Sequence, residues 1–229
     1  MEHKKEFLLL LTLLFLPPAL IFASRNLLPH SYLFSSLYKL VFLYPLFHRI
    51  IFEKKSFIKS LSEHFSWRTF RVSLRKTALF GLLVGLTYYL AYLFFKHNFT
   101  TQTIIQNLQE SATINTNNLL MIGIYIIFVN SLLEEYFWRG FLFEKLIKNS
   151  KPIFAYLITG IAFSFHHLVF YFTWFTWPFL LLATFGLVSF ALLMNYIFQK
   201  YHDLFSCWLI HLCADTAQIL IALKIFGLL

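Results

Sequence analysis

Charged residues are scarce in this 229-residue chain: they make up 13% of it, whereas 59% of the residues are hydrophobic. A soluble domain carries about a quarter charged residues, so this chain has too few charges to cover a water-facing surface. Cysteine is also rare, with only Cys207 and Cys213. Because they lie six residues apart in one apolar segment, they project from different faces of a helix and cannot form a disulfide. An ordinary soluble domain and a disulfide scaffold are both excluded.

The chain also lacks the motifs of several function classes. It has no zinc-knuckle spacing, no glycine-rich phosphate loop and no aromatic–basic platform, so the net charge of +9 does not indicate a nucleic-acid partner. The H-E-x-x-H signature of zinc proteases, internal repeats and low-complexity tracts are absent as well. Many basic residues fall between apolar segments, where they set membrane topology and contact anionic headgroups.

Aromatic residues, in contrast, are abundant. The 30 Phe, 12 Tyr and 5 Trp suit a bilayer and its interfaces better than a small soluble core. Several stretches contain the roughly 20 mainly apolar residues that a helix needs to cross the hydrocarbon core. The sequence therefore predicts an all-α, polytopic transmembrane bundle of about seven spans. The expected spans cover residues 7–23, 31–52, 77–95, 118–148, 153–173, 177–199 and 204–226.

The segments near the N-terminus leave alternatives open. A signal peptide is the rival interpretation of 7–23, but this run has no clear small-x-small cleavage site, so we expect a retained first helix. The basic segment 53–76 is either an amphipathic helix on the membrane face or a basic loop, and 96–117 is expected to be a polar loop. The positive-inside rule places the basic segments, and with them the N-terminus, in the cytoplasm.

Ionisable groups inside membrane spans are costly and rare, so each is a candidate functional residue. Glu134 and Glu135 lie in the middle of the span 118–148, and Arg139 follows in the run LLEEYFWRGF. Glu135 and Arg139 stand four residues apart on one helix face and can form an ion pair. Glu134 then lies at a different azimuth, free to meet another helix. The two adjacent carboxylates repel each other unless a cation or a metal compensates.

Histidine and aspartate occur at similar depths in two later spans. His166 and His167 lie about midway along the fifth expected span, and His211 and Asp215 stand four residues apart in the seventh. A lone histidine in an apolar helix is more often a helix–helix hydrogen-bonding residue than a catalyst. No structural need, however, calls for acid, base and imidazole at one depth, so the conjunction favours a catalytic site.

The order of the polar residues matches a known set of motifs. The chain contains E-E-x-x-x-R at Glu134, Glu135 and Arg139, F-x-x-x-H at Phe163 and His167, and H-x-x-x-D at His211 and Asp215. Over roughly residues 118–220 it resembles the CPBP family of intramembrane proteases, which includes the type II CAAX prenyl endopeptidases and the bacterial Abi proteins. The resemblance divides the chain into N-terminal membrane helices, 1–117, and a catalytic helical core, 118–229. The last motif commonly ends in Asn in that family, whereas here it ends in Asp215.

The resemblance implies hydrolysis of a peptide bond within the membrane, without a covalent intermediate. Glu134, helped by His167, would activate a water, and His211 with Asp215 would stabilise the oxyanion. The F-x-x-x-H spacing selects His167, with His166 as the alternative. The supporting residues are Glu135, Arg139, Phe163 and His166.

The cofactor and the partner stay open at this point. Glu134, His167 and His211 could form a zinc site of two imidazoles and one carboxylate, so metal-dependent and metal-free hydrolysis are both retained. The expected partner is a membrane-embedded or lipidated peptide, and the expected location is a bacterial inner membrane. The alternatives are a catalytically silent scaffold or bacteriocin self-immunity protein, and a proton-coupled transporter. Transporters usually show internal repeats, which this sequence lacks.

Overall fold

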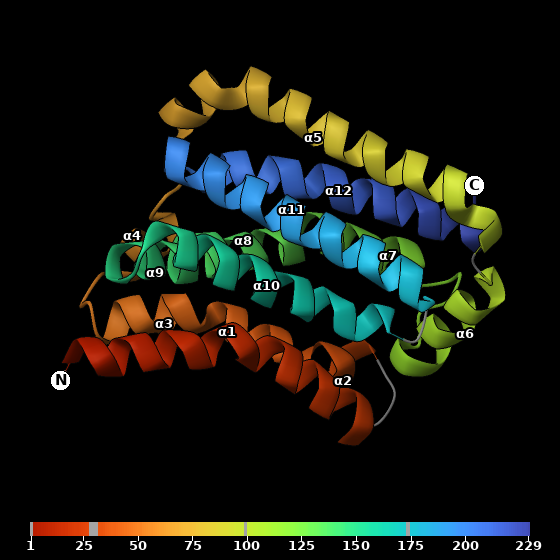
Figure 1. The fold of residues 1–229 in the computed structure, drawn as a ribbon, viewed down its shortest axis with the longest axis horizontal. Coiled ribbons are helices and arrows are strands. Elements are labelled where there is room, and N and C mark those ends of the chain that lie inside the picture. Colours follow the sequence, from red (N-terminus) through yellow and green to blue (C-terminus); the bar gives the residue numbers. More distant parts are fainter. Residues whose placement is uncertain (1, 28–31, 99, 173–174) are drawn as a thin grey trace.

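The computed structural model describes residues 2–27, 32–98, 100–172 and 175–229, and every regular element in these ranges is helical (Figure 1). Six helices are long and apolar enough to cross a membrane, which makes this a multi-pass membrane protein of the all-α class. The six candidate spans are Lys5–Ser24, Phe57–Phe95, Leu119–Asn149, Pro152–Tyr171, Trp177–Tyr201 and Leu204–Ile225.

The first helix, α1 (Glu2–Leu27), is part of the bundle. Leu10, Leu14 and Ile21 point inward and are almost fully buried, and the helix contacts α10 (Pro152–Tyr171). Its apolar side is therefore used for packing against the rest of the protein.

The expected span 31–52 is not one helix. Its described part consists of three short pieces, α2 (Tyr32–Ser36), the 3₁₀ segment η1 (Leu37–Leu43) and α3 (Tyr44–Ile51). A 3₁₀ segment has poorer hydrogen-bond geometry than an α-helix and interrupts it, and Pro45, which has no N–H, lies in the first turn of α3. None of the pieces is long enough to count as a span, so six candidate spans replace the seven expected in the described part of the chain.

The basic segment 53–76 also differs from a single amphipathic helix. It forms α4 (Phe57–Ser62), a turn, and the first turns of α5 (Trp67–Phe95), which continues through the expected third span. The expected polar loop 96–117 contains the short 3₁₀ turn η2 (Lys96–Asn98) and the helix α6 (Thr101–Ala112).

The fourth expected span is helical from Leu119 to Asn149, but two π segments interrupt its α geometry. Its parts in order are α7 (Leu119–Tyr125), π segment η3 (Ile126–Asn130), α8 (Ser131–Phe137), π segment η4 (Trp138–Phe143) and α9 (Glu144–Asn149). The glutamate pair lies in α8, between the two π segments. Such segments are rare and frequently occur at functional sites.

The last three spans agree with the sequence expectation: α10, α11 (Trp177–Tyr201) and α12 (Leu204–Ile225). Figure 1 shows α5 lying along α12, with the two chain ends at opposite ends of the bundle. A methyl group added at Gly85 of α5 would lie 3.0 Å from the carbonyl oxygen of Cys213, so the absence of a side chain there permits the close approach of α5 to α12.

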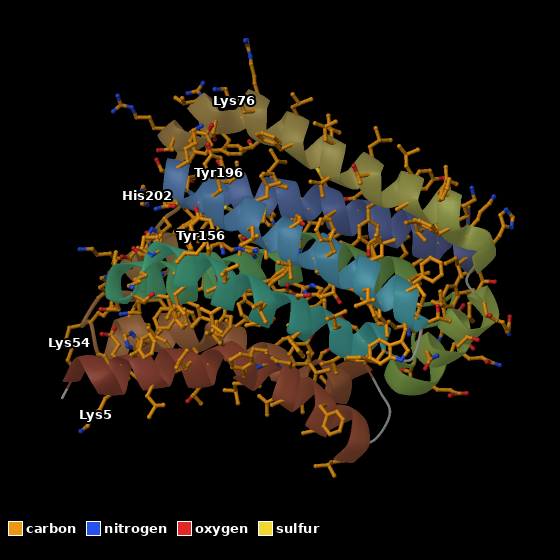
Figure 2. All side chains as sticks on the ribbon, viewed as in Figure 1. Lys5, Lys54, Lys76, Tyr156, Tyr196 and His202 are labelled. Atoms are coloured by element: carbon orange, nitrogen blue, oxygen red, sulfur yellow. The ribbon has the colours of Figure 1, made fainter. Side chains whose placement is uncertain are left out.

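Charged side chains join the pieces at the end of the bundle that carries the N-terminus. Figure 2 shows Lys5 and Lys54 at this end. Here the buried Arg49 of α3 donates hydrogen bonds to the backbone carbonyls of Ser60 and Gly140. These contacts tie the broken second pass to the π segment η4, and therefore to the helix that carries the glutamate pair.

Candidate active site

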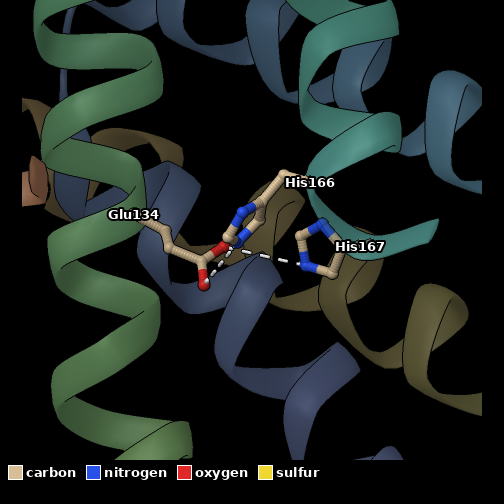
Figure 3. Close-up of side chains that lie close together, drawn as sticks. All are labelled: Glu134, His166 and His167. Carbon is tan, nitrogen blue, oxygen red and sulfur yellow. Dashed lines mark ion pairs between the residues drawn. The ribbon is translucent and has the colours of Figure 1, made fainter. Parts of the chain in front are cut away.

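Glu134 is buried and faces three imidazole rings. The Nε2 atoms of His166 and His167 each lie 3.7 Å from its carboxylate, and Nε2 of His211 lies 4.0 Å from it. Figure 3 shows Glu134 pointing from α8 toward the two consecutive histidines of α10. Only 3% of Glu134 is exposed, so these rings and not solvent form its surroundings. The structure thus brings the glutamate and histidines of three expected spans into one layer.

Asn130 is a site residue that the sequence reasoning missed. At the end of η3, its Nδ2 donates a hydrogen bond of 2.6 Å to Oε1 of Glu134. Since the carboxylate can only accept, the amide nitrogen must face it, and the amide oxygen is turned elsewhere. A polar side chain four residues before Glu134, inside an apolar span, was the signal that could have revealed it.

Glu135 forms a bridge between two helices. Its Oε1 accepts hydrogen bonds from Nη1 of Arg139 at 2.9 Å and from Nδ1 of His211 at 2.7 Å. The contact with Arg139 follows from the i, i+4 spacing, whereas the contact with His211 crosses from α8 to α12 and could not be read from spacing. The expectation that the two glutamates serve separate partners was therefore too simple, because His211 lies near both.

Hydrogen bonds fix which nitrogen of two histidines faces Glu134. Nδ1 of His167 lies 3.0 Å from the carbonyl oxygen of Phe163, and Nδ1 of His211 lies 2.7 Å from Glu135. Because both partners are acceptors, Nδ1 carries the hydrogen in each ring. The Nε2 atoms are thus directed toward the Glu134 carboxylate. His167 is the more exposed of the rings, with 21% of its side chain accessible, which places it at the open edge of the site.

Asp215 and Phe163 complete the wall around His211. Oδ1 of Asp215 lies 3.7 Å from Nε2 of His211. The Phe163 ring lies 4.5 Å from the His167 ring and 4.5 Å from the Arg139 guanidinium carbon, so it separates the ion pair from the histidine of the same helix. These contacts give the F-x-x-x-H phenylalanine a packing role.

The donor groups fit a metal ion. Ligand atoms of Glu134, His166 and His167 all lie within 4.8 Å of one another. Two imidazoles and one carboxylate are a ligand set that zinc accepts in catalytic sites. The expected set used His211 in place of His166; the geometry brings both histidines of α10 to Glu134.

Several buried polar atoms of the site have no hydrogen-bond partner among the described residues. They are Asn130 Oδ1, Glu134 Oε2, Glu135 Oε2, His166 Nδ1 and Asp215 Oδ2. Buried polar atoms in folded proteins are nearly always bonded, and exceptions gather where a site must bind something. The free Oε2 of Glu134 is therefore available to a reacting group.

One wall of the site comes from the broken second pass. The rings of Tyr38 and Phe42, both in η1, lie 5.4 Å and 5.5 Å from the His166 ring. Both aromatic residues are buried. The interruption of the second pass thus places two aromatic side chains directly against a site histidine.

Residues 116–217 match the family model described as "Type II CAAX prenyl endopeptidase Rce1-like". These residues form an Rce1-like CAAX protease domain. No curated protein and no solved structure matches the chain. The Rce1-like domain contains every one of Glu134, His166, His167, His211 and Asp215. The resemblance seen in the motifs is thereby confirmed, and Tyr38 and Phe42 of η1 contact the Rce1-like domain from outside it.

Proposed function

We propose that the protein is an intramembrane endopeptidase that hydrolyses a peptide bond with a water activated by Glu134. The observation that carries the proposal is a buried carboxylate with one unpartnered oxygen, surrounded by three imidazoles, within an Rce1-like protease domain. A peptide bond inside a membrane needs a sheltered water and a base to cleave it, and this group supplies the base in a buried layer.

In the proposed reaction, Oε2 of Glu134 takes a proton from water while the water oxygen attacks the scissile carbonyl. Asn130 holds the other carboxylate oxygen, Oε1, and so directs Oε2 toward the water. A protonated His211, kept in orientation by Glu135, donates through Nε2 to the developing oxyanion. The proton held by Glu134 then passes, with the help of His167, to the leaving nitrogen as the C–N bond breaks. The products are a carboxylate and an amine.

A metal ion is compatible with the same residues. Glu134, His166 and His167 would hold it, or Glu134 with His167 and His211, and a bound zinc would activate the attacking water as a Lewis acid. In either case Asn130 and Glu135 orient the same carboxylate and imidazole. Exhaustive chelation that leaves full activity would exclude an obligatory metal, whereas loss restored by added zinc would support one.

The remaining assignments belong to the same proposal. The substrate is a membrane-embedded or lipidated peptide, and the core 118–229 carries out catalysis while 1–117 provides N-terminal membrane helices. In this proposal the protein lies in a bacterial inner membrane with its N-terminus in the cytoplasm; lysines such as Lys5 and Lys54 at the N-terminal end of the bundle support the cytoplasmic placement.

A comparison of membrane peptides in cells carrying wild type, Glu134→Gln or Glu110→Gln tests this function. Glu110 is exposed on α6, so its variant controls for the chemical change alone. We expect peptides whose cleavage disappears only with Glu134→Gln. If all three cell lines give identical peptide profiles and Glu134→Gln cells keep the wild-type phenotype, a silent scaffold or self-immunity protein is favoured. If Glu134→Gln abolishes a proton-coupled uptake of solute, a transporter is favoured.

A further inference from the structure

Lys39 of η1 lies close to the active site without belonging to the Rce1-like domain. Its ammonium donates a hydrogen bond of 3.2 Å to the Tyr32 hydroxyl and lies 4.9 Å from the centre of the Tyr125 ring. The preceding residue, Tyr38, contacts the ring of His166. Lys39 is therefore carried by the same short segment that forms the aromatic wall of the site.

The charge of Lys39 is not balanced locally. Lys39 is half-buried, and no carboxylate of the described residues lies within ion-pair distance of its ammonium. Lys55, Lys145 and Lys148, in contrast, all contact glutamates. A lysine held away from water is costly, and the two tyrosine rings compensate for only part of that cost.

The carboxylates of the site, Glu134 and Asp215, attract the Lys39 ammonium electrostatically from beyond ion-pair distance. The Lys39 ammonium therefore lies in the electrostatic surroundings of the catalytic layer while remaining unpaired. An anionic group placed beside Lys39 would gain an ion pair without displacing an existing one.

The spacing of Tyr125 and Glu134 along their common helix indicates how far an anionic group bound at Lys39 would lie from the reacting bond. Tyr125 precedes Glu134 by nine residues on one helix, which corresponds to about 13 Å at 1.5 Å per residue. An extended peptide covers at most about 3.3–3.6 Å per residue, so it needs about four residues to span this separation.

We propose that Lys39, framed by Tyr32 and Tyr125, binds a carboxylate of the peptide substrate about four residues from the scissile bond, and so determines where the peptide is cut. This inference rests on the proposed protease function. The carboxylate is either the free C-terminus of the peptide or the side chain of an Asp or Glu; both offer the same anionic group.

Matched synthetic peptides test the proposal with the full-length protein in liposomes. The probes are hydrophobic peptides made in pairs, one pair with a C-terminal carboxylate or amide and another with Glu or Gln within four residues of the cut. We expect wild type to prefer the carboxylate member of one pair by about tenfold or more in kcat/KM, since an ion pair removed from water contributes at least about 1.4 kcal/mol. Lys39→Met removes this preference and Lys39→Arg retains part of it.

Lys200→Met is the matched control, because Lys200 also bonds a tyrosine hydroxyl, that of Tyr196, and lies over tyrosine rings, but is fully exposed. It should keep the preference. If Lys39→Met loses the preference within the first pair, the group bound by Lys39 is the terminal carboxylate. If it loses the preference within the second pair, the group is an acidic side chain. An equal preference in wild type and in a folded Lys39→Met protein would overturn the proposal.

A binding measurement separates this proposal from the protease function. Binding of the same pairs to the Glu134→Gln protein, with and without Lys39→Met, needs no turnover. Tighter binding of the carboxylate peptide that depends on Lys39 supports the subsite even if no peptide is cleaved, in which case only the protease function fails. Equal binding of both members of each pair contradicts the subsite even if wild type cleaves them.

Discussion

The Oε1 atom of Glu135 lies 2.7 Å from Nδ1 of His211, so the second glutamate of the pair orients the imidazole that faces the first. The same oxygen accepts from Arg139 at 2.9 Å. A single buried atom therefore connects α8, η4 and α12. In the proposed reaction, Glu134 supplies the reactive carboxylate, and the adjacent Glu135 holds its imidazole neighbour.

Replacing Glu135 by glutamine should destabilise the protein. The substitution removes the negative charge beside a guanidinium that is 1% exposed, and an unpaired buried charge costs about 3–5 kcal/mol. Denaturant unfolding in detergent measures this loss. The double variant Glu135→Gln with Arg139→Met should recover part of it, because no unpaired cation remains. Equal unfolding free energies for wild type and Glu135→Gln would contradict the assigned bridge.

Replacing Asn130 by alanine should reduce kcat more than it reduces stability. Oε1 of Glu134 loses its donor, and removing one positioned hydrogen bond in a buried site lowers the rate by about 10²–10³-fold. Steady-state kinetics with any cleaved peptide measures the change. Asn195→Ala is the control, because Asn195 is also buried but bonds Thr159 away from the glutamates. A similar kcat loss in both variants would show that Asn130 acts only through the fold.

Replacing Gly85 by alanine should separate α5 from α12. The new methyl group would lie 3.0 Å from a backbone oxygen that cannot rotate away, and overpacking of this kind costs about 1–3 kcal/mol. Thermal unfolding of the purified protein measures this loss of stability. Gly186→Ala has no atom within 4 Å of the added methyl and should be neutral or slightly stabilising. If both variants unfold at the wild-type temperature, the close approach at Gly85 is not required.

The pH dependence of stability should depend on Glu53, which lies between α3 and α4 at the charged end of the bundle. Partial burial opposes its ionisation, but hydrogen bonds from Lys55 and Lys145 outweigh this and lower the pKa of Glu53 to about 2. Because the folded pKa lies below the ordinary value, the stabilisation is present above about pH 4.5 and is lost as the pH falls toward 2. Melting temperatures between pH 5 and pH 2 should fall less steeply for Glu53→Gln than for wild type; parallel curves would refute this.

Much of the architecture could be predicted because membrane spans are encoded by length and apolarity. The helices α1, α10, α11 and α12 follow the apolar runs closely. The broken second pass could not be recognised in this way, since 31–52 is as apolar as a span although η1 divides it. Its shape depends on contacts far away in sequence, such as those of Arg49 with Gly140.

The site was predictable where spacing alone determines a contact. Glu135 and Arg139 meet because four residues make one helical turn. The contact of Asn130 with Glu134 has the same four-residue spacing and could have been predicted in the same way. The contact of Glu135 with His211 crosses between helices, so no sequence rule predicts it. Lys39 stands in the sequence as a lysine inside the apolar segment 31–52, but its position beside the site depends on the fold.

Cleavage of synthetic membrane peptides by purified protein in liposomes tests the central claim about Glu134 most directly, with the new termini identified by mass spectrometry. Wild type and Glu110→Gln should produce the same fragments, whereas a folded Glu134→Gln protein should produce none. Unchanged fragments from Glu134→Gln would contradict the role of this carboxylate as the base that activates the water.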